Sequence, residues 1–211
     1  YPGVLRIILV DDQSDDGTAA VARAAPGADG RLQVIQGKPL PQGWTGKLWA
    51  LAQGVERATQ EGAPAYVLLT DADVGHDPGN LRALVARAEA GQLALTSQMV
   101  RLHCRTAPET LLIPAFVFFF QMLFPFAWVN NPRRRTAAGA GGCMLARREA
   151  LEAAGGIAAV RAEIIDDCAL AARLKRQGPI WLGLTVRAES LRPYVTVGEI
   201  ATDAQGKFLA L

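Results

Sequence analysis

The 211-residue chain is organised around Tyr66–Asp73, which reads Tyr-Val-Leu-Leu-Thr-Asp-Ala-Asp. Its apolar run predicts a buried strand, because the run is too short for a helix and acidic residues end it. In an open α/β sheet, ligands bind at the carboxyl ends of the strands. Asp71 and Asp73 lie on the same side of an extended chain, because side chains alternate along a strand. The pair therefore indicates either an acidic surface turn or a site for a divalent cation with a phosphate-bearing ligand.

Segments typical of strands and helices alternate along the rest of the chain. The expected strands are Val4–Val10, Leu32–Gln36, Tyr66–Thr70, Leu93–Leu102 and Ile180–Leu184. The expected helices are Thr18–Ala25, Lys47–Gln60, a helix that starts at Asp77-Pro78 and ends before Gly91, Arg148–Ala154 and Asp166–Gln177. The near-continuous apolar run of Val4–Val10 predicts a strand that is buried on both faces. The alternation predicts an α/β fold with a mostly parallel, Rossmann-like sheet flanked by helices.

Length and composition indicate a single domain and exclude several classes of protein. The net charge of +2 gives no support to nucleic-acid binding by bulk electrostatics. Three widely spaced cysteines, Cys104, Cys143 and Cys168, fit a reducing compartment and form no Cys-x-x-Cys metal pair. Two histidines are too few for a zinc site.

A Phe-rich segment, Leu111–Val129, interrupts the alternation and is apolar apart from Gln121. Its length suits a membrane span. A single crossing would however separate Asp71 and Asp73 from everything that follows Arg133–Arg135. We therefore expect an interfacial or re-entrant segment, with a buried core segment and a true span as the alternatives. The arginine triplet favours anionic headgroups on the cytoplasmic face of a membrane.

Acidic residues also follow the first expected strand. Asp15 and Asp16 fit the role of helix caps. Asp12 is better placed to accept hydrogen bonds from a ligand, such as a base N–H or a ribose hydroxyl. Acidic ends of two parallel strands converge at one edge of a sheet, so we expect Asp12 near Asp71 and Asp73.

Two further groups could take part in chemistry. Lys47 at the start of a helix is unfavourable for the helix dipole, so it indicates an anionic partner, with a solvated lysine as the alternative. Asp166 and Asp167 open another helix, where acidic residues act as caps or, beside a pocket, as a general base. The small residues around Gly141 and Gly142 let the backbone approach a ligand or another strand closely.

Four motifs in order resemble those of family 2 glycosyltransferases, which have the GT-A fold. They are Val10-Asp11-Asp12-x-Ser14-x-Asp16-Gly17-Thr18, Gly46-Lys47-x-x-Ala50-Leu51, Asp71-Ala72-Asp73 and Asp166-Asp167-x-x-Leu170. Their spacing covers nearly the whole chain. With Gly43-Trp44-x-Gly46-Lys47 and the Phe-rich segment ahead of Gly-Gly-Cys-Met, the pattern is similar to hopanoid-biosynthesis-associated glycosyltransferases and, more loosely, to ceramide glucosyltransferases.

The resemblance implies an inverting transfer of a sugar from a nucleotide-diphosphate-sugar, expected to be a UDP-sugar, to a hydroxyl of a lipid-like acceptor such as a hopanoid. It implies Mg²⁺ or Mn²⁺ as cofactor, and a protein that acts at the cytoplasmic face of the bacterial inner membrane. The implied donor-binding residues are Asp12, Lys47, Asp71 and Asp73, with Asp73 as the metal ligand and Asp167 as the catalytic base; Asp11, Asp166, Gly141 and Gly142 are secondary candidates.

The resemblance also divides the chain. Residues 1–211 are expected to form one GT-A-like catalytic domain, with a nucleotide-sugar-binding half (1–102), the apolar and basic segment (111–135) and an acceptor-binding half (136–194). The family's first strand has no counterpart in the sequence, so we expect a fragment that lacks it. The Gln/Arg-x-x-Arg-Trp motif of processive relatives is absent, and Ser190–Tyr194 is the nearest stretch.

Two alternatives remain at this point. A haloacid-dehalogenase-like phosphatase would use Asp71 as nucleophile, but Gly75 stands where that family has Thr or Val, and the first acidic cluster would have no role. A membrane-docked scaffold that has kept the fold and lost turnover is the second.

Overall fold

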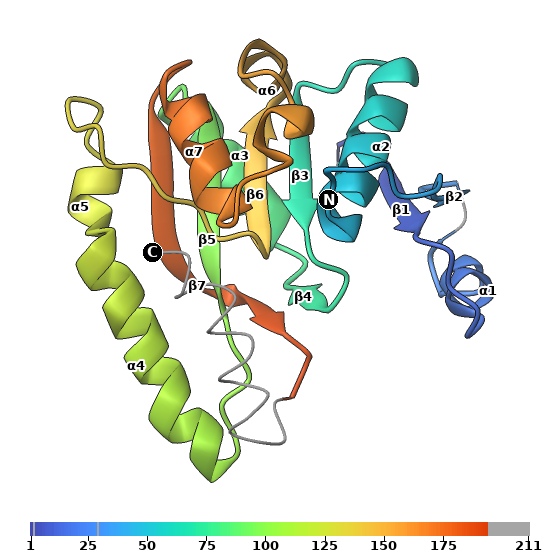
Figure 1. The fold of residues 1–211 in the computed structure, drawn as a ribbon, viewed down its shortest axis with the longest axis horizontal. Helices are drawn as coiled ribbons and strands as arrows, with labels where there is room; N and C mark the ends of the chain where they lie inside the picture. Colours follow the sequence, from blue (N-terminus) through green and yellow to red (C-terminus); the bar gives the residue numbers. More distant parts are fainter. Residues whose placement is uncertain (2, 29, 194–211) are drawn as a thin grey trace.

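The computed structural model describes residues 1, 3–28 and 30–193. Within them the chain builds an α/β fold with two sheets (Figure 1). β1 (Ile7–Asp11) and β2 (Leu32–Gln36) form a parallel pair, and five further strands form a second sheet in the order β3-β6-β5-β7-β4. The expected α/β class with flanking helices is confirmed. The last residue of the expected acceptor-binding half, Tyr194, lies outside the described residues.

The five-stranded sheet consists of β3 (Tyr66–Thr70), β4 (Val74–His76), β5 (Leu95–Arg101), β6 (Cys143–Arg147) and β7 (Ile180–Ser190). β5 and β7 are parallel, whereas β6 runs antiparallel to both of its neighbours and β4 antiparallel to β7. The sheet is therefore mixed, in place of the mostly parallel sheet that the alternation predicted. The antiparallel direction of β6 sets Cys143 opposite Thr70, so the chain entering β6 lies beside the end of β3.

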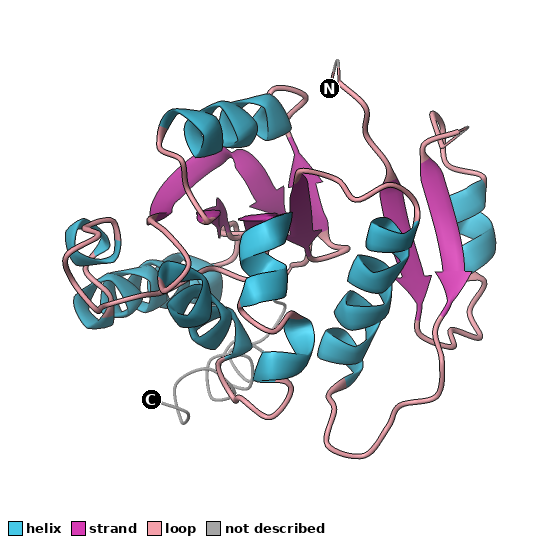
Figure 2. Ribbon diagram, turned by 90° about the horizontal axis from the view of Figure 1, so that it is seen from above, coloured by secondary structure: helices cyan, strands magenta, loops and turns pink. Residues whose placement is uncertain are grey.

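The helices cover the sheets and connect them. They are α1 (Thr18–Arg23), α2 (Gly46–Gln60), α3 (Asn80–Ala90), α4 (Ala107–Leu123), α5 (Phe126–Val129), α6 (Arg148–Ala153), the 3₁₀ turn Ile157–Val160 and α7 (Asp166–Lys175). α2 stands between the two sheets (Figure 2). Its Leu48 belongs to the core of the larger sheet, while Gly54 on the same helix faces Val10 of β1.

The core belongs to the larger sheet. Its largest fully buried side chains include Leu84, Leu95, Leu145, Leu151, Leu174 and Leu182. The prediction that Val4–Val10 is buried on both faces is wrong: β1 pairs with β2 and packs against α2, and Asp11 is its one buried residue. Val4 is 93% exposed and Ile7 47% exposed.

Several boundaries differ from the expected ones for local reasons. α3 begins at Asn80 because Asp77-Pro78-Gly79 forms a turn, in which the Gly79 N–H donates to Asp77 Oδ1 over 2.8 Å. The short strand β4 was not expected, and β7 extends to Ser190 because it pairs with β4 beyond Leu184.

The Phe-rich segment forms two helices, α4 and α5. α4 begins at Ala107, before the expected start, because Thr106 and Glu109 form a capping box. A break at Phe124-Pro125 separates it from α5. Of the helices in the described part of the chain, none combines the length and apolar character needed to cross a membrane.

Candidate active site

Two loops meet at the carboxyl end of β3. One is Asp71-Ala72-Asp73, and the other runs through Gly141-Gly142 into β6. The hydroxyl of Thr70, the last residue of β3, donates a hydrogen bond to the Gly142 carbonyl over 2.9 Å. The antiparallel β3–β6 pair thus brings an acidic turn and a glycine turn side by side.

Lys47 reaches this junction from the first turn of α2. Its Nζ lies 2.8 Å from Asp71 Oδ1, so the expected anionic partner of this lysine is Asp71. Burial of Lys47 opposes its charge, but the hydrogen bond and the charge of Asp71 outweigh burial and raise the pKa of Lys47, with smaller contributions from Asp166 and Asp167. The lysine therefore stays protonated at neutral pH and presents a positive charge at the mouth of the site.

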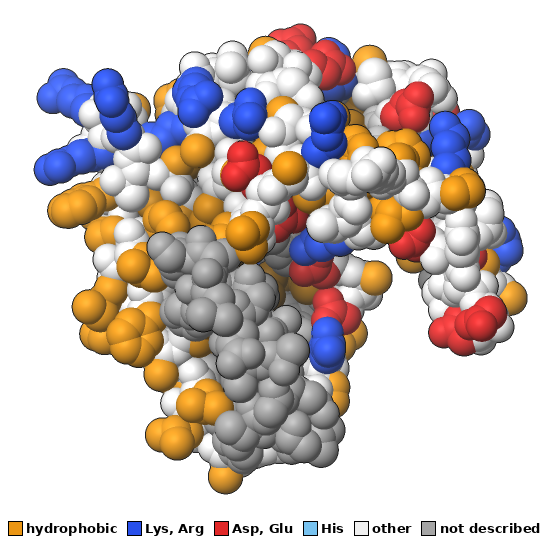
Figure 3. All heavy atoms as spheres, in the orientation of Figure 1, with side chains coloured by type: hydrophobic (Ala, Val, Ile, Leu, Met, Phe, Trp, Pro, Cys, Tyr) orange, Lys and Arg blue, Asp and Glu red, His pale blue; other side chains and the backbone are white. Residues whose placement is uncertain are grey.

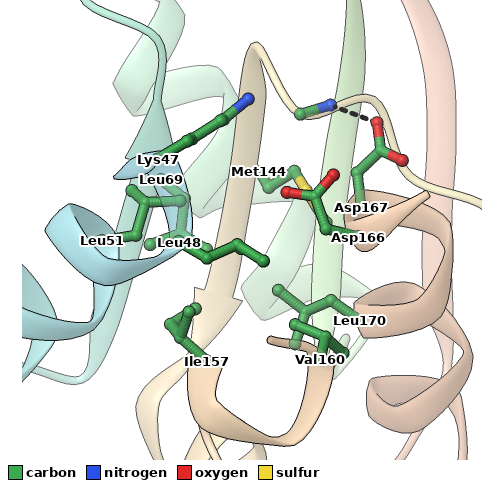
Figure 4. Close-up of a pocket in the computed structure, with 11 residues that line it drawn as sticks. Lys47, Leu48, Leu51, Leu69, Met144, Ile157, Val160, Asp166, Asp167 and Leu170 are labelled. Atoms are coloured by element: carbon green, nitrogen blue, oxygen red, sulfur yellow. Dashed lines mark hydrogen bonds between the residues drawn. The ribbon is translucent and has the colours of Figure 1, made fainter. Parts of the chain in front are cut away.

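Asp167 faces the same junction from the start of α7 (Figure 4). Its Oδ2 accepts a hydrogen bond from the Gly141 N–H over 3.0 Å, and its Oδ1 accepts one from the Cys168 N–H over 2.7 Å. Burial raises the pKa of Asp167, and the charge of Asp166 adds to this, while the two hydrogen bonds and Lys47 act in the opposite direction. A carboxylate that is half-buried, oriented and of raised pKa has the properties of a general base.

Gly141 permits this close arrangement. A Cβ at this position would lie 3.3 Å from Lys47 Nζ and 3.4 Å from Asp167 Oδ2. Gly139 is more tightly confined, because a Cβ there would lie 2.7 Å from Met144 Cε and 3.1 Å from the Asp167 carbonyl oxygen. Gly142 contributes its carbonyl to Thr70. The small residues that the sequence singled out therefore bring the loop before β6 against both α2 and α7.

A pocket opens between α2, β3, β6 and α7 (Figure 4). Lys47, Gly141, Asp166 and Asp167 line its polar end. Lys47, Asp166 and Asp167 are labelled in Figure 4. The rest of the lining is apolar: Leu48, Leu51, Leu69, Met144, Ile157, Val160 and Leu170. The apolar lining residues belong to the main core, so only the charged end of this small pocket offers contacts to a ligand.

Asp12 and Asp11 follow β1 but have different surroundings. Asp12 is exposed and lies against the start of α2, since a Cβ on Gly46 would be 3.0 Å from Asp12 Oδ2. This places Asp12 next to the first turn of α2, which carries Lys47. Asp11 is buried; its Oδ1 accepts a hydrogen bond from the Ser14 N–H, and its carbonyl accepts one from the Gly37 N–H. Asp11 therefore supports the turn that presents Asp12.

Asp73 is the candidate metal ligand. It is partly exposed, and its backbone carbonyl accepts a hydrogen bond from the Leu191 N–H over 2.7 Å, which fixes the turn. In the part of the chain that the structure describes, no three His, Cys, Asp or Glu side chains are grouped to hold a metal by themselves. Mg²⁺ is commonly held by one or two carboxylates together with substrate phosphates, so the carboxylate of Asp73 fits a metal that a diphosphate helps to hold.

A hydrogen-bond network around His76, next to the Asp71–Asp73 turn, was not predicted from the sequence. His76 Nε2 lies 2.9 Å from Thr70 Oγ1, and His76 Nδ1 lies 3.0 Å from Asn80 Nδ2. Because the Thr70 hydroxyl donates to Gly142, it accepts from Nε2–H, and Nδ1 then accepts from Asn80. Burial lowers the pKa of His76, which favours this neutral ring. Only the short strand β4, which no sequence pattern indicated, brings His76 back beside Thr70.

The family model described as "Glycosyl transferase family 2" matches residues 1–155, which is more than half of the chain. The chain therefore belongs to glycosyl transferase family 2. The phosphatase alternative loses its support, because the chain belongs to a glycosyltransferase family. No curated protein matches the sequence.

Solved structures share the fold. A crystal structure described as that of a mycobacterial protein has 20% sequence identity and a TM-score of 0.53, over 96% of this chain and 62% of that one. Glucosyl-3-phosphoglycerate synthase from Mycobacterium tuberculosis, in complex with Mn²⁺, UDP and glucosyl-3-phosphoglycerate, has 18% identity and a TM-score of 0.53, over 96% of this chain and 65% of that one. The chain thus spans less than two thirds of the length of these structures and has a glycosyltransferase fold.

Proposed function

We propose that the chain transfers a sugar from a nucleotide-diphosphate-sugar to an acceptor hydroxyl, with inversion at the anomeric carbon and with Mg²⁺ or Mn²⁺ bound. Membership of glycosyl transferase family 2 supports the reaction class. The observation that carries the proposal is the meeting of Lys47, Asp71 and Asp167 around Gly141. This cluster sets a cation, an acidic turn and a half-buried candidate base at one junction.

The residues divide between donor and acceptor. Asp12 accepts hydrogen bonds from the nucleoside, and Lys47 and Asp71 bind the diphosphate and sugar end of the donor. Asp73 holds the metal ion, which supplies charge neutralisation of the leaving diphosphate when it is bound. The UDP and Mn²⁺ in the structure of the mycobacterial synthase favour UDP as the nucleotide. Burial raises the pKa of Asp167, and the charge of Asp166 beside it at the rim raises this pKa further.

Asp167 removes the proton from the acceptor hydroxyl as that oxygen attacks the anomeric carbon. The Gly141 N–H holds Oδ2 in place, so Oδ1 and Oδ2 have fixed directions before the acceptor arrives. Correct orientation of base, acceptor and donor in line supplies a large part of such rate enhancements. The raised pKa makes the carboxylate a stronger base than an exposed aspartate.

We propose a lipid-like alcohol, such as a hopanoid, as the acceptor, and the cytoplasmic face of the bacterial inner membrane as the place of the reaction. The exposed apolar side chains of α4 are the observation that supports this proposal. The mycobacterial synthase carries a small anionic product instead, so phosphoglycerate is the alternative acceptor to be compared.

The test is a transfer assay with a panel of UDP-sugars and two acceptor classes, lipid alcohols in mixed micelles and 3-phosphoglycerate. We expect transfer to a lipid alcohol with Mn²⁺ and none after EDTA treatment. Asp167→Asn should lower turnover by about 10²- to 10⁴-fold, the usual contribution of a general base. Mn²⁺-dependent UDP binding by this variant should stay close to that of the unmodified chain, because Asp167 faces the acceptor.

Asp15→Asn is the matched control, because Asp15 is an exposed acid in the turn after β1 and should leave turnover unchanged. Transfer that survives EDTA would count against the role of Asp73. Transfer that survives Asp167→Asn would overturn the assignment of the base. UDP binding without transfer to any acceptor would favour the inactive scaffold.

A further inference from the structure

The outward side of α4 is apolar along its whole length. Leu111, Ala115, Phe118 and Met122 are exposed and follow the i, i+4, i+7, i+11 spacing of one helix face. Phe118 is 63% exposed and Met122 59% exposed, with Phe119 and Leu123 exposed beside them. We call the set Leu111, Ala115, Phe118, Phe119, Met122 and Leu123 the α4 face. A surface helix normally has polar residues on this side.

The opposite side of α4 is packed, so the face is held in place by the fold. Ile113 is buried, and Phe120 and Phe124 pack against the main core with their ring centroids 5.2 Å apart. At the helix start, Glu109 is fully buried and accepts hydrogen bonds from the backbone N–H groups of Arg105 and Thr106, while its Oε1 lies 2.8 Å from His103 Nδ1. The apolar face therefore belongs to a helix whose start and inner side are both anchored.

Positive charge adjoins one end of this face. Arg133, Arg134 and Arg135 are exposed in the loop after α5, and the Arg134 guanidinium lies 5.0 Å from the ring centroid of Trp128, which is itself half-exposed. Among the described residues, no ion pair involves these three arginines. In Figure 3, basic side chains gather beyond α5 and apolar side chains continue along α4.

We propose that the α4 face and Arg133–Arg135 dock on an anionic lipid bilayer, with α4 lying along the interface. The two chemistries together favour this partner: the α4 face is apolar enough to enter the boundary of the acyl chains, and the arginines match anionic headgroups. The helix of 17 residues is roughly 25 Å long, so it offers a long line of contact parallel to the surface. A second copy of the chain would cover the α4 face, but it would leave Arg133–Arg135 without an anionic partner.

The inference deepens the membrane location proposed above, which uses the same α4 side chains. It does not depend on sugar transfer, because it involves no residue of the candidate active site. Its failure is therefore distinguishable from failure of the proposed function. A protein that binds vesicles and transfers no sugar, or the reverse, would separate the two.

The experiment measures partition of the full chain between buffer and sedimented vesicles. One vesicle is pure phosphatidylcholine, and the other contains 30 mol% phosphatidylglycerol, about one anionic lipid in three. We expect binding to the anionic vesicle, weaker binding to the neutral one, and a loss of the difference between them at high salt, because salt screens the arginine contribution.

Two double variants separate the apolar contribution to vesicle binding from the contribution of the arginines. Phe118→Gln/Met122→Gln should weaken binding to both vesicles by at least about tenfold, because two exposed apolar side chains no longer enter the bilayer. Arg133→Gln/Arg135→Gln should weaken binding to the anionic vesicle by roughly 30-fold and leave binding to the neutral vesicle nearly unchanged. The second variant spares Arg134, which contacts Trp128.

Matched control variants replace exposed apolar and arginine side chains elsewhere on the surface. Val21→Gln changes an exposed apolar residue of α1, and Arg23→Gln/Arg82→Gln removes two exposed arginines; both should bind vesicles as the unmodified chain does. Circular dichroism and thermal melting confirm that each variant is folded.

Three results would overturn the proposal. They are absence of binding to either vesicle, double variants that bind as the controls do, and self-association of the chain in buffer that Phe118→Gln/Met122→Gln abolishes. The last would identify the α4 face as an interface between two copies.

Discussion

Asp167 illustrates how surroundings change one side chain. Its burial disfavours the carboxylate form, and the neighbouring charge of Asp166 acts in the same direction. The Gly141 N–H and the Lys47 ammonium favour the carboxylate. Burial is the largest cause of the raised pKa of Asp167, and two residues of opposite charge, Asp166 and Lys47, adjust it in opposite directions and can be changed separately.

Two variants should therefore shift the pKa of Asp167 in opposite directions. Asp166→Asn should lower the pKa of Asp167 toward its ordinary value, and Lys47→Met should raise it further, since each variant removes one side of the balance. Carbon-13 NMR of aspartate carboxyl groups can follow the titration without substrate. In a transfer assay, the acid limb of the kcat/KM profile of Asp166→Asn should move to lower pH, because the base must be deprotonated to act.

The Asp15→Asn variant is again the reference and should not move the titration. A pKa of Asp167 that falls in both variants, or rises in both, would contradict the described charge balance.

At the residue scale, the sequence predicted which residues belong to the candidate site better than it predicted which of them contact one another. The unfavourable place of Lys47 in its helix indicated an anionic partner, and the structure supplies Asp71. The separate tasks of Asp11 and Asp12 could not be read from the sequence, because both follow the same strand and only the packing of α2 distinguishes them. The Thr70–His76 contact was also beyond prediction, since it depends on a three-residue strand.

At the scale of elements, the two sheets differ in how much surface they bury. β6 is buried from Cys143 to Ala146, and β5 from Leu95 to Met99. In β1 and β2 only Asp11 is buried, and α1, which covers β2, has no buried residue. The smaller sheet therefore has little apolar burial to stabilise it.

Native-state hydrogen exchange should reveal this difference. We expect the amides of β1 and β2 to exchange through a local opening of lower free energy than the amides of β5 and β6, because regions with few buried contacts open more easily. Mass spectrometry of peptides from each element measures it directly. Equal protection in the two sheets would show that α2 couples them into one cooperative unit.

The strand β6 and its direction are the main features of the fold that the sequence did not predict, because the residues around Gly141 and Gly142 indicated only a close approach of the backbone. Alternating strand and helix patterns predict parallel pairing, and the expected strands correspond to β1, β2, β3, β5 and the first part of β7. Direction depends on the long passage through α4 and α5, which turns the chain round before Gly139. The site nevertheless forms, because the antiparallel entry brings Gly141 to the end of β3.

At the scale of the whole molecule, the candidate donor site joins the two sheets. Asp12 follows β1 of the smaller sheet, whereas Asp71 and Asp73 follow β3 of the larger one. A nucleotide held by Asp12 and a metal held by Asp73 would therefore connect parts of the protein that are otherwise joined mainly through α2.

Donor binding should thus protect the smaller sheet selectively. With UDP and Mn²⁺ at a hundredfold excess over Kd, we expect a stabilisation of about 2.7 kcal/mol, and slower exchange of the β1 and β2 amides in particular. Asp12→Ala should remove the protection of β1 and β2. Protection confined to the larger sheet in the unmodified chain would contradict a site that joins both.

The separation of the sheets has a further consequence for handling the protein. Among the described residues, β1 pairs with β2 alone and β3 with β6 alone, so each strand has one edge whose N–H and C=O groups lack a strand partner. Such edges are templates for intermolecular strand addition, which natural proteins usually block with charge, proline or a cover. The apolar sequences Ile7–Val10 and Tyr66–Leu69 offer neither charge nor proline. Aggregation of this protein would therefore begin at these two edges, and a bound nucleotide would slow it by holding both strands in place.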